Sequence, residues 1–156
     1  GVSDYQVEDD YTPDTDILLF GIAPHMHYRG SSFYCKIVPP DEEEKIIFSM
    51  PNYRMTWQGI YWFKDPLALP KGTKIVCSGI FDNSEMNELN PDPSEEVLYG
   101  QQSWKEMFEG WLLYSKRTDK NAAKFDELYN ASLSEQKTSS PLQAAPVKED
   151  ELNKKP

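Results

Sequence analysis

The chain has 156 residues, which is enough for one domain with a hydrophobic core and a tail but short for two full domains. A hydrophobic share of 38%, with 4 Trp, 9 Tyr and 7 Phe, supplies the apolar surface of a compact fold and argues against a wholly disordered chain. The net charge of −10 is unevenly distributed. Residues 1–114 hold 19 acidic and 8 basic side chains, a balance of −11, and residues 115–156 have a balance of +1. An acidic folded part disfavours nucleic acids and anionic membrane surfaces as partners and favours cations.

The most apolar stretch of the chain, residues 17–23, is far shorter than the roughly 18 apolar residues of a membrane-spanning helix. We therefore expect no membrane insertion. The chain starts at Gly1 without an initiator Met or a signal peptide, so we expect either a processed mature form or a fragment of a longer protein.

Short runs of β-branched and aromatic residues, separated by Pro, Gly, Asn and Asp, dominate the first two thirds of the chain. This pattern is typical of an antiparallel β-sandwich, and it predicts an all-β domain over residues 1–118. Asp65-Pro66 and Pro70-Lys71-Gly72 are among the predicted turns. The expected strands cover residues 5–10, 16–23, 32–38, 45–50, 57–63, 73–82 and 107–114.

The segments that flank the last expected strand have a different character. Residues 94–105 are expected to contain a turn of helix, with Ser103 as its cap and Glu106 three residues on. Residues 119–156 are rich in Lys, Ala, Ser, Gln, Glu and Pro, which predicts a low-complexity tail that is disordered or loosely docked. One short helix is expected within it, at residues 121–130.

Two further groups of residues admit structural interpretations. Cys35 and Cys77 each lie in a predicted strand, where they are either buried thiols or a disulfide between neighbouring strands, and the sequence leaves both open. Aromatic residues at 57 and 61–63 are assigned to packing, because such clusters in sandwich strands are usually core or cross-strand pairs.

The only two histidines of the chain, His25 and His27, stand two residues apart at the end of a predicted strand. Because side chains alternate along a strand, both rings point from the same face. Such a pair can chelate a metal, and imidazole suits Zn, Cu, Fe and Ni alike. Taken alone, however, such a motif more often marks two ordinary histidines that satisfy local hydrogen bonds.

A metal held by this pair would need another ligand, and the chain has no third His and no Cys close by in sequence. A thioether or a carboxylate is therefore indicated. Met26 faces away from its neighbouring histidines by the same alternation, and the spacing does not choose among Met50, Met55, Met86 and Met107.

Several motifs, taken together and in order over residues 5–115, resemble the C-terminal domain of copper type II ascorbate-dependent monooxygenases, most closely bacterial members. Animal relatives in this family are peptidylglycine α-hydroxylating monooxygenase and dopamine β-monooxygenase. The motifs are His25-Met26-His27-Tyr28-Arg29-Gly30, Pro51-Asn52-Tyr53, Trp57-Gln58, Leu69-Pro70-Lys71-Gly72-Thr73, Phe81-Asp82-Asn83-Ser84, Asn90-Pro91-Asp92-Pro93 and Trp104-Lys105-Glu106-Met107.

The resemblance implies a jelly-roll-like β-sandwich that binds one copper ion, at which O2 is activated. In the family the ligands are a His-x-His pair, which matches His25 and His27, and one later Met. That Met lies in a Glu-Met step that opens the last strand, which matches Glu106-Met107 and disfavours Met86. A thioether also suits copper that must pass through Cu(I), because soft sulfur favours the reduced ion.

The sequence departs from the family pattern in several places. The peptide-amidating branch has an Arg two residues before the first His, where this chain has Ala23, so peptide amidation is not implied. Glu109 and Trp111 replace an Asn and a Tyr of that branch, which predicts a different and more acidic pocket. Phe108 replaces a Cys of the animal enzymes, so their disulfide at this position is not expected.

In the family, a second copper on a His-rich N-terminal domain supplies an electron, and ascorbate is the reductant. With His25 and His27 used at one site, this chain cannot build the second, so the resemblance implies an upstream or separate His-rich copper domain as partner. O2 and an organic substrate would be the other partners, and the location would be periplasmic or secreted. The alternatives to the oxidoreductase are a copper-binding module without turnover and a structural or assembly module of a larger complex.

Overall fold

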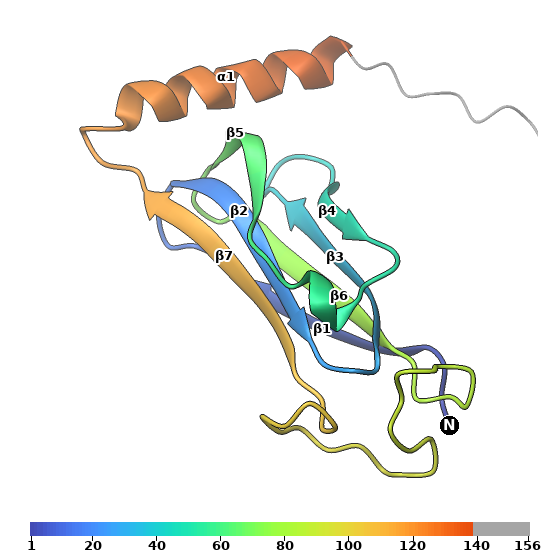
Figure 1. The fold of residues 1–156 in the computed structure, drawn as a ribbon. Coiled ribbons are helices and arrows are strands. Elements are labelled where there is room, and N and C mark those ends of the chain that lie inside the picture. Colours follow the sequence, from blue (N-terminus) through green and yellow to red (C-terminus); the bar gives the residue numbers. More distant parts are fainter. Residues whose placement is uncertain (139–156) are drawn as a thin grey trace, which may run out of the picture.

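The fold is described from a computed structural model, which defines the structure of residues 1–138 (Figure 1). Within this range the chain forms seven β-strands, a short 3₁₀ helix and one α-helix. In chain order these are β1 (Tyr5–Tyr11), β2 (Ile17–Met26), β3 (Gly30–Val38), β4 (Lys45–Met50), η1 (Met55–Trp57), β5 (Tyr61–Leu69), β6 (Lys74–Phe81), β7 (Phe108–Lys116) and α1 (Ala122–Thr138).

The strands form two antiparallel sheets that pack face to face. One sheet has the order β1-β6-β3-β4 and the other β5-β2-β7. The core between them is apolar, and it includes Ile17, Leu19, Ile22 and Met26 of β2, all fully buried. The predicted all-β antiparallel sandwich is confirmed.

A disulfide joins Cys35 of β3 to Cys77 of β6, which answers the question that the sequence left open. The two residues are direct partners in the register of these strands. The bridge therefore links the two central strands of the four-stranded sheet, inside the core cluster that also contains Phe33.

β2 contains an irregularity that changes which residues face the core. Before it Ile17 and Leu19 are in the core, and after it Ile22 and Met26 are, so the alternation shifts by one residue. The shift falls between Leu19 and Gly21, in the pairing with both neighbouring strands. A side chain at Gly21 would meet the carbonyl oxygen of Tyr61 at 2.7 Å, so this position requires glycine.

The strand predicted at residues 57–63 is wrong in its position, since β5 starts at Tyr61 and continues through the predicted Asp65-Pro66 turn. The reason is a bulge: Leu67 pairs with Leu19 and Trp62 pairs with Gly21, so residues 63–66 stand opposite Phe20 alone. β5 is also an edge strand. Proline is tolerated at a bulge on an edge, because no partner requires its missing N–H.

Two other expectations are corrected. Residues 94–105 contain turns and an isolated bridge but no helix. Among the aromatic residues assigned to packing, Tyr61 and Phe63 do contact the core, whereas Trp57 and Trp62 are each 63% exposed. Trp62 pairs with Gly21 on the outer face of its sheet, where no second layer covers it at this point.

Helix α1 lies across one end of the sandwich (Figure 1). It covers the region of the expected helix at 121–130 and continues past residue 130. Phe125 is buried against Leu18 and Ala68, with Leu128 and Tyr129 beside it. No helix in residues 1–138 is long and apolar enough to cross a membrane. The rest of the expected tail, residues 139–156, lies outside the described residues, and the domain boundary at 118 stays a prediction.

Candidate metal site

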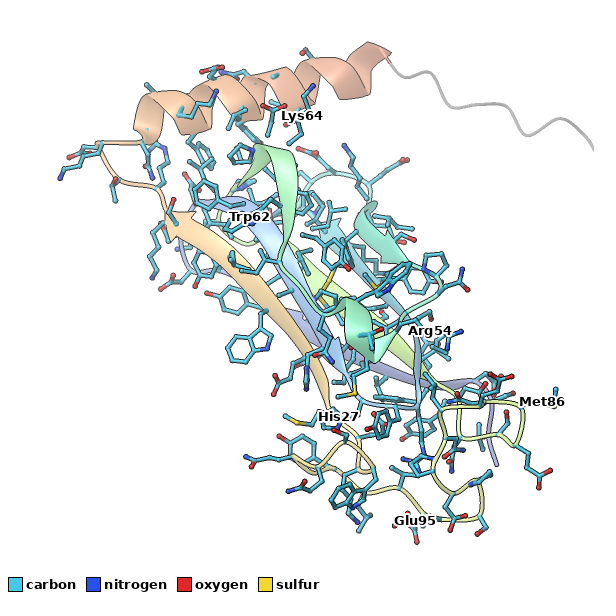
Figure 2. All side chains as sticks on the ribbon, in the orientation of Figure 1. His27, Arg54, Trp62, Lys64, Met86 and Glu95 are labelled. Atoms are coloured by element: carbon cyan, nitrogen blue, oxygen red, sulfur yellow. A yellow bond between two sulfur atoms is a disulfide. The ribbon has the colours of Figure 1, made fainter. Side chains whose placement is uncertain are left out.

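The two histidines lie side by side where β2 ends, at the end of the sandwich away from α1 (Figure 2). Their ring centroids are 5.0 Å apart and the rings are nearly perpendicular. Met26 between them is fully buried in the core, as the alternation along the strand predicts. The strand thus directs both imidazoles away from the core.

The His25 ring is oriented by a glutamine from the segment that follows η1. Nδ1 of His25 donates a hydrogen bond to the side-chain oxygen of Gln58. The amide nitrogen of Gln58 in turn donates to the carbonyl oxygen of Met26 at 3.4 Å, which fixes the direction of the Gln58 side chain. With Nδ1 protonated, the lone pair of Nε2 on His25 is free to bind a metal.

The His27 ring is held by the main chain just before β7. Its Nδ1 donates to the carbonyl oxygen of Lys105 at 3.2 Å, so Nε2 is again the nitrogen with a free lone pair. The residue is only 4% exposed. Burial lowers the pKa of His27, which favours the neutral imidazole that a metal requires.

Glu106 ties the histidine segment to the start of β7. Its two carboxylate oxygens accept hydrogen bonds from the backbone N–H groups of His27, at 3.1 Å, and Arg29, at 2.8 Å. Burial raises the pKa of Glu106 to about 6, although these hydrogen bonds and the Arg29 charge oppose the shift. Both N–H groups lie beyond the end of β2, so Glu106 takes the place of a strand partner for them.

Arg29 extends this network into the loop between β6 and β7. Its guanidinium is almost fully buried and donates to the side chain of Asn83 at 2.8 Å and to the carbonyl oxygen of Trp104 at 2.7 Å. It also lies 3.8 Å from a Glu106 oxygen. The long loop is thus anchored to the turn that follows the histidines.

Tyr53 fixes the backbone between the two histidines. Its buried hydroxyl donates to the carbonyl oxygen of Met26 at 2.7 Å and accepts from the N–H of the same residue at 2.9 Å. Burial raises the pKa of Tyr53 to about 12, so the hydroxyl keeps its proton. The Met26 peptide groups therefore have little freedom to turn the flanking rings.

The register of β2 and β7 ends one residue short of Met107. The last pairs are His25 with Glu109 and Met26 with Phe108, and one more step of the same register would set Met107 opposite His27. Residues that stand opposite each other in a ladder direct their side chains to the same face. Met107 is partly buried.

The other methionines are placed less favourably. Met26 and Met50 are buried in the core, and Met55 packs against it. Met86 is 87% exposed in the loop after β6, and Figure 2 shows it well away from His27. Among the side chains described, those of residues 1–134, no three His, Cys, Asp or Glu form a group that could hold a metal. A carboxylate third ligand thus has no candidate in this part of the chain.

The donor set fits copper chemically. Two imidazoles whose Nδ1 atoms are engaged in hydrogen bonds, together with a thioether, suit an ion that exists as both Cu(I) and Cu(II). Beside His25, the Glu109 carboxylate accepts a hydrogen bond of 2.8 Å from the indole N–H of Trp111, which is largely exposed. The face next to the histidines therefore carries a negative charge and an aromatic ring.

Sequence reasoning missed the roles of three residues at this site. Gln58, Tyr53 and Glu106 all belong to the family motifs, but the motifs do not show what these side chains bind. All three act across more than 25 positions of sequence, so no local pattern shows their partners. Asp82 and Asp92 form Asx turns, in which their carboxylates accept from the backbone N–H groups of residues two positions on.

Comparison with known proteins gives one family. Residues 4–133 match the model of the copper type II ascorbate-dependent monooxygenase C-terminal domain. No functionally curated protein matches the chain significantly. The matched range contains every residue of the site described above.

Proposed function

The chain belongs to the copper type II ascorbate-dependent monooxygenase family, as its C-terminal domain, and we propose that it binds the copper ion at which O2 is activated for C–H hydroxylation. His25, His27 and Met107 would hold this ion. The observation that carries the proposal is that both rings have Nδ1 bonded to a carbonyl-type oxygen, which leaves both Nε2 atoms free at neighbouring rings.

The chain's own residues would contribute a preorganised ligand set. Gln58 and the Lys105 carbonyl select the tautomer of each imidazole, while Glu106 and Tyr53 hold the backbone on either side of Met26. Copper, when bound, would supply the redox chemistry with O2. Because Met107 lies in the segment that also carries Lys105 and Glu106, one stretch of chain would both bind the metal and orient His27.

A complete monooxygenase reaction would require a partner. The chain has only two histidines, and the proposed site uses both. We therefore assign electron supply to a His-rich copper domain, upstream or separate, with ascorbate as the reductant of the family and an organic molecule as substrate. Without such a partner, the same site would make the domain a copper-binding module without turnover, or part of a larger assembly.

The disulfide supports an extracytoplasmic location, periplasmic or secreted. Disulfides form and persist in oxidising compartments and are rare in reducing ones. Cys35 and Cys77 are both buried in the core, so the bridge belongs to the folded domain and not to an exposed, exchangeable pair.

Titration of the apo protein with Cu(I) and with Cu(II) tests the site. We expect one copper ion per chain, lost in His25→Ala and His27→Ala, and weakened mainly for Cu(I) in Met107→Ala because the thioether is a soft ligand. Met86→Ala, in an exposed loop, is the matched control and should bind like the wild type. Copper binding that ignores both histidine substitutions would refute the assignment.

Hydroxylation is a second measurement. The copper-loaded protein is combined with ascorbate, O2 and a His-rich copper domain, and oxygen uptake is followed with candidate substrates. Oxygen uptake that requires His25, His27 and the added domain would support the monooxygenase. Copper binding without uptake in any pairing would favour the binding module.

A further inference from the structure

A cavity of about 550 Å³ opens at the end of the sandwich that carries the histidines. It lies among β1, the end of β6, the start of β7 and the loop between these last two strands. Its volume falls within the range of small-molecule sites, roughly 300–1,000 Å³. Within the described part of the chain neither histidine lines it, although Glu106 and Met107 do.

Most of the lining side chains are apolar, and several are exposed to water. The core side is formed by Val7, Phe81 and Phe108. The outer side includes Tyr5, Leu98 and Tyr99, which are 60%, 59% and 76% exposed. A molecule in the cavity would cover this apolar surface, which gives the driving force for binding.

The polar groups in the wall already have partners. The Arg29 guanidinium donates to Asn83 and to a backbone carbonyl, and both Glu106 oxygens accept backbone N–H groups. The N-terminal ammonium of Gly1, which also lines the cavity, donates to the carbonyl oxygen of Pro93 at 3.0 Å. Glu95 and Glu96 also line it; Glu95 lies 3.9 Å from Nζ of Lys105, and Glu96 adds a further carboxylate that would repel an anion.

Glu106 connects this cavity to the histidine segment. The same side chain lines the cavity and accepts the N–H groups of His27 and Arg29. A molecule that packs against Glu106 would therefore contact the acceptor of these two hydrogen bonds. The connection is direct, through a single side chain.

We propose that this cavity is a second binding site of the domain, for a small, uncharged, apolar molecule, and that its occupancy acts on the His27 backbone through Glu106. Binding itself does not depend on copper. Where the proposed copper site is also occupied, the two ligands would change each other's affinity by the same factor, a consequence that rests on the proposed function.

The test uses two fluorescent probes with related ring systems, applied to the whole apo chain. N-phenyl-1-naphthylamine is uncharged, and 1-anilinonaphthalene-8-sulfonate adds a negative charge. We expect the uncharged probe to bind at one site and the sulfonate to bind at least about tenfold more weakly. Equal binding of the two probes would overturn the assignment of an uncharged ligand.

Leu98→Asp places a charge in the wall at an exposed position, so the fold is preserved. It should weaken binding of the uncharged probe about tenfold. Ile46→Asp, at an equally exposed apolar position on β4 outside the cavity, is the matched control and should leave binding unchanged. Equal affinities of Leu98→Asp and the wild type would overturn the location.

The effect on the histidine segment is read by NMR of the apo protein, without copper. Addition of the uncharged probe should shift the backbone N–H resonances of His27 and Arg29, which bond to Glu106, while that of Ile46 stays in place. Probe binding without any shift at His27 and Arg29 would refute the coupling. A failure of copper to bind the histidines would leave this readout intact and would count against the proposed function alone.

Discussion

The two ends of β2 use the outer face of one sheet in different ways. Near its start, Leu18 is buried under Phe125 of α1 by apolar contact. At its end, His25 and His27 are held by hydrogen bonds that their Nδ1 atoms donate to the side-chain oxygen of Gln58 and to the Lys105 carbonyl oxygen. Apolar contact stabilises without fixing an angle, whereas hydrogen bonds select one orientation and one tautomer.

The comparison indicates that stability and ligand placement are separable along this strand. Changes under α1 should alter the free energy of unfolding and spare copper binding. Changes around the histidines should weaken copper binding and have less effect on the free energy of unfolding. The loss of copper affinity should be larger where the altered contact orients a ring more directly.

Phe125→Ala should have the largest effect on stability. Removal of a buried Phe typically costs about 3–5 kcal/mol, and Phe125 is the most buried of residues 122–134 of α1. We expect the free energy of unfolding in urea to fall by about 3 kcal/mol, with unchanged copper stoichiometry at low urea. Lys124→Ala, exposed on the same helix, is the control. A loss of copper binding in folded Phe125→Ala would contradict the separation of the two ends.

Glu106→Ala should affect both properties. It leaves the N–H groups of His27 and Arg29 without their acceptor in a buried environment, which costs about 2 kcal/mol of unfolding free energy. Glu106→Gln keeps one acceptor oxygen and should recover part of the loss. Urea denaturation and copper titration measure the two effects. If Glu106→Ala matched the wild type in both, the carboxylate would have no positioning role.

Gln58→Leu should lower copper affinity with little change in stability. Loss of a partner that orients a ligand histidine typically costs about 10–100-fold in metal affinity, and we expect about tenfold here. Gln58→Glu retains an oxygen that accepts from Nδ1 of His25 and should keep most of the affinity. Competition titration with a Cu(I) chelator measures both variants. A drop in Gln58→Glu as large as in Gln58→Leu would argue against the orienting hydrogen bond.

Trp111→Phe should have the smallest effect. It removes the indole N–H that bonds to Glu109, but the residue is largely exposed, so the unfolding free energy should change by less than about 0.5 kcal/mol. Copper affinity should also stay within about twofold, because neither residue is a proposed ligand. Thermal denaturation and the same chelator competition measure this. A large loss of copper would indicate that Glu109 or Trp111 contributes to the site.

The sequence was informative where local patterns determine structure. Six of the seven expected strands overlap their observed counterparts closely, and the side-by-side histidines follow from strand alternation alone. The position of β5 failed because Asp65-Pro66 is usually a turn, and only the pairing with β2 shows that a bulge accommodates it. The assignment of Trp62 to packing in the core was also wrong, because the exposure of a strand residue depends on which layer covers its face of the sheet.

The candidate site could be predicted only in part. His25 and His27 follow from their spacing, but the hydrogen bonds that leave Nε2 free come from Gln58 and Lys105, which lie 33 and 78 positions away in sequence. Contacts at such separations depend on the fold as a whole. Met107 was indicated by the family resemblance and not by its own spacing, and the register with β2 now adds a physical reason for it.

The bulge in β5 also affects whether the exposed edge of this strand can pair with a strand of another folded molecule. An edge strand offers a row of free N–H and C=O groups to which another chain can pair, and regular edges promote aggregation. In β5 this row is interrupted by Pro66, next to the charged Lys64 and Asp65. Pro66, Lys64 and Asp65 therefore have two effects. They make this segment look like a turn in the sequence, and they disfavour pairing of the β5 edge with a strand of another molecule.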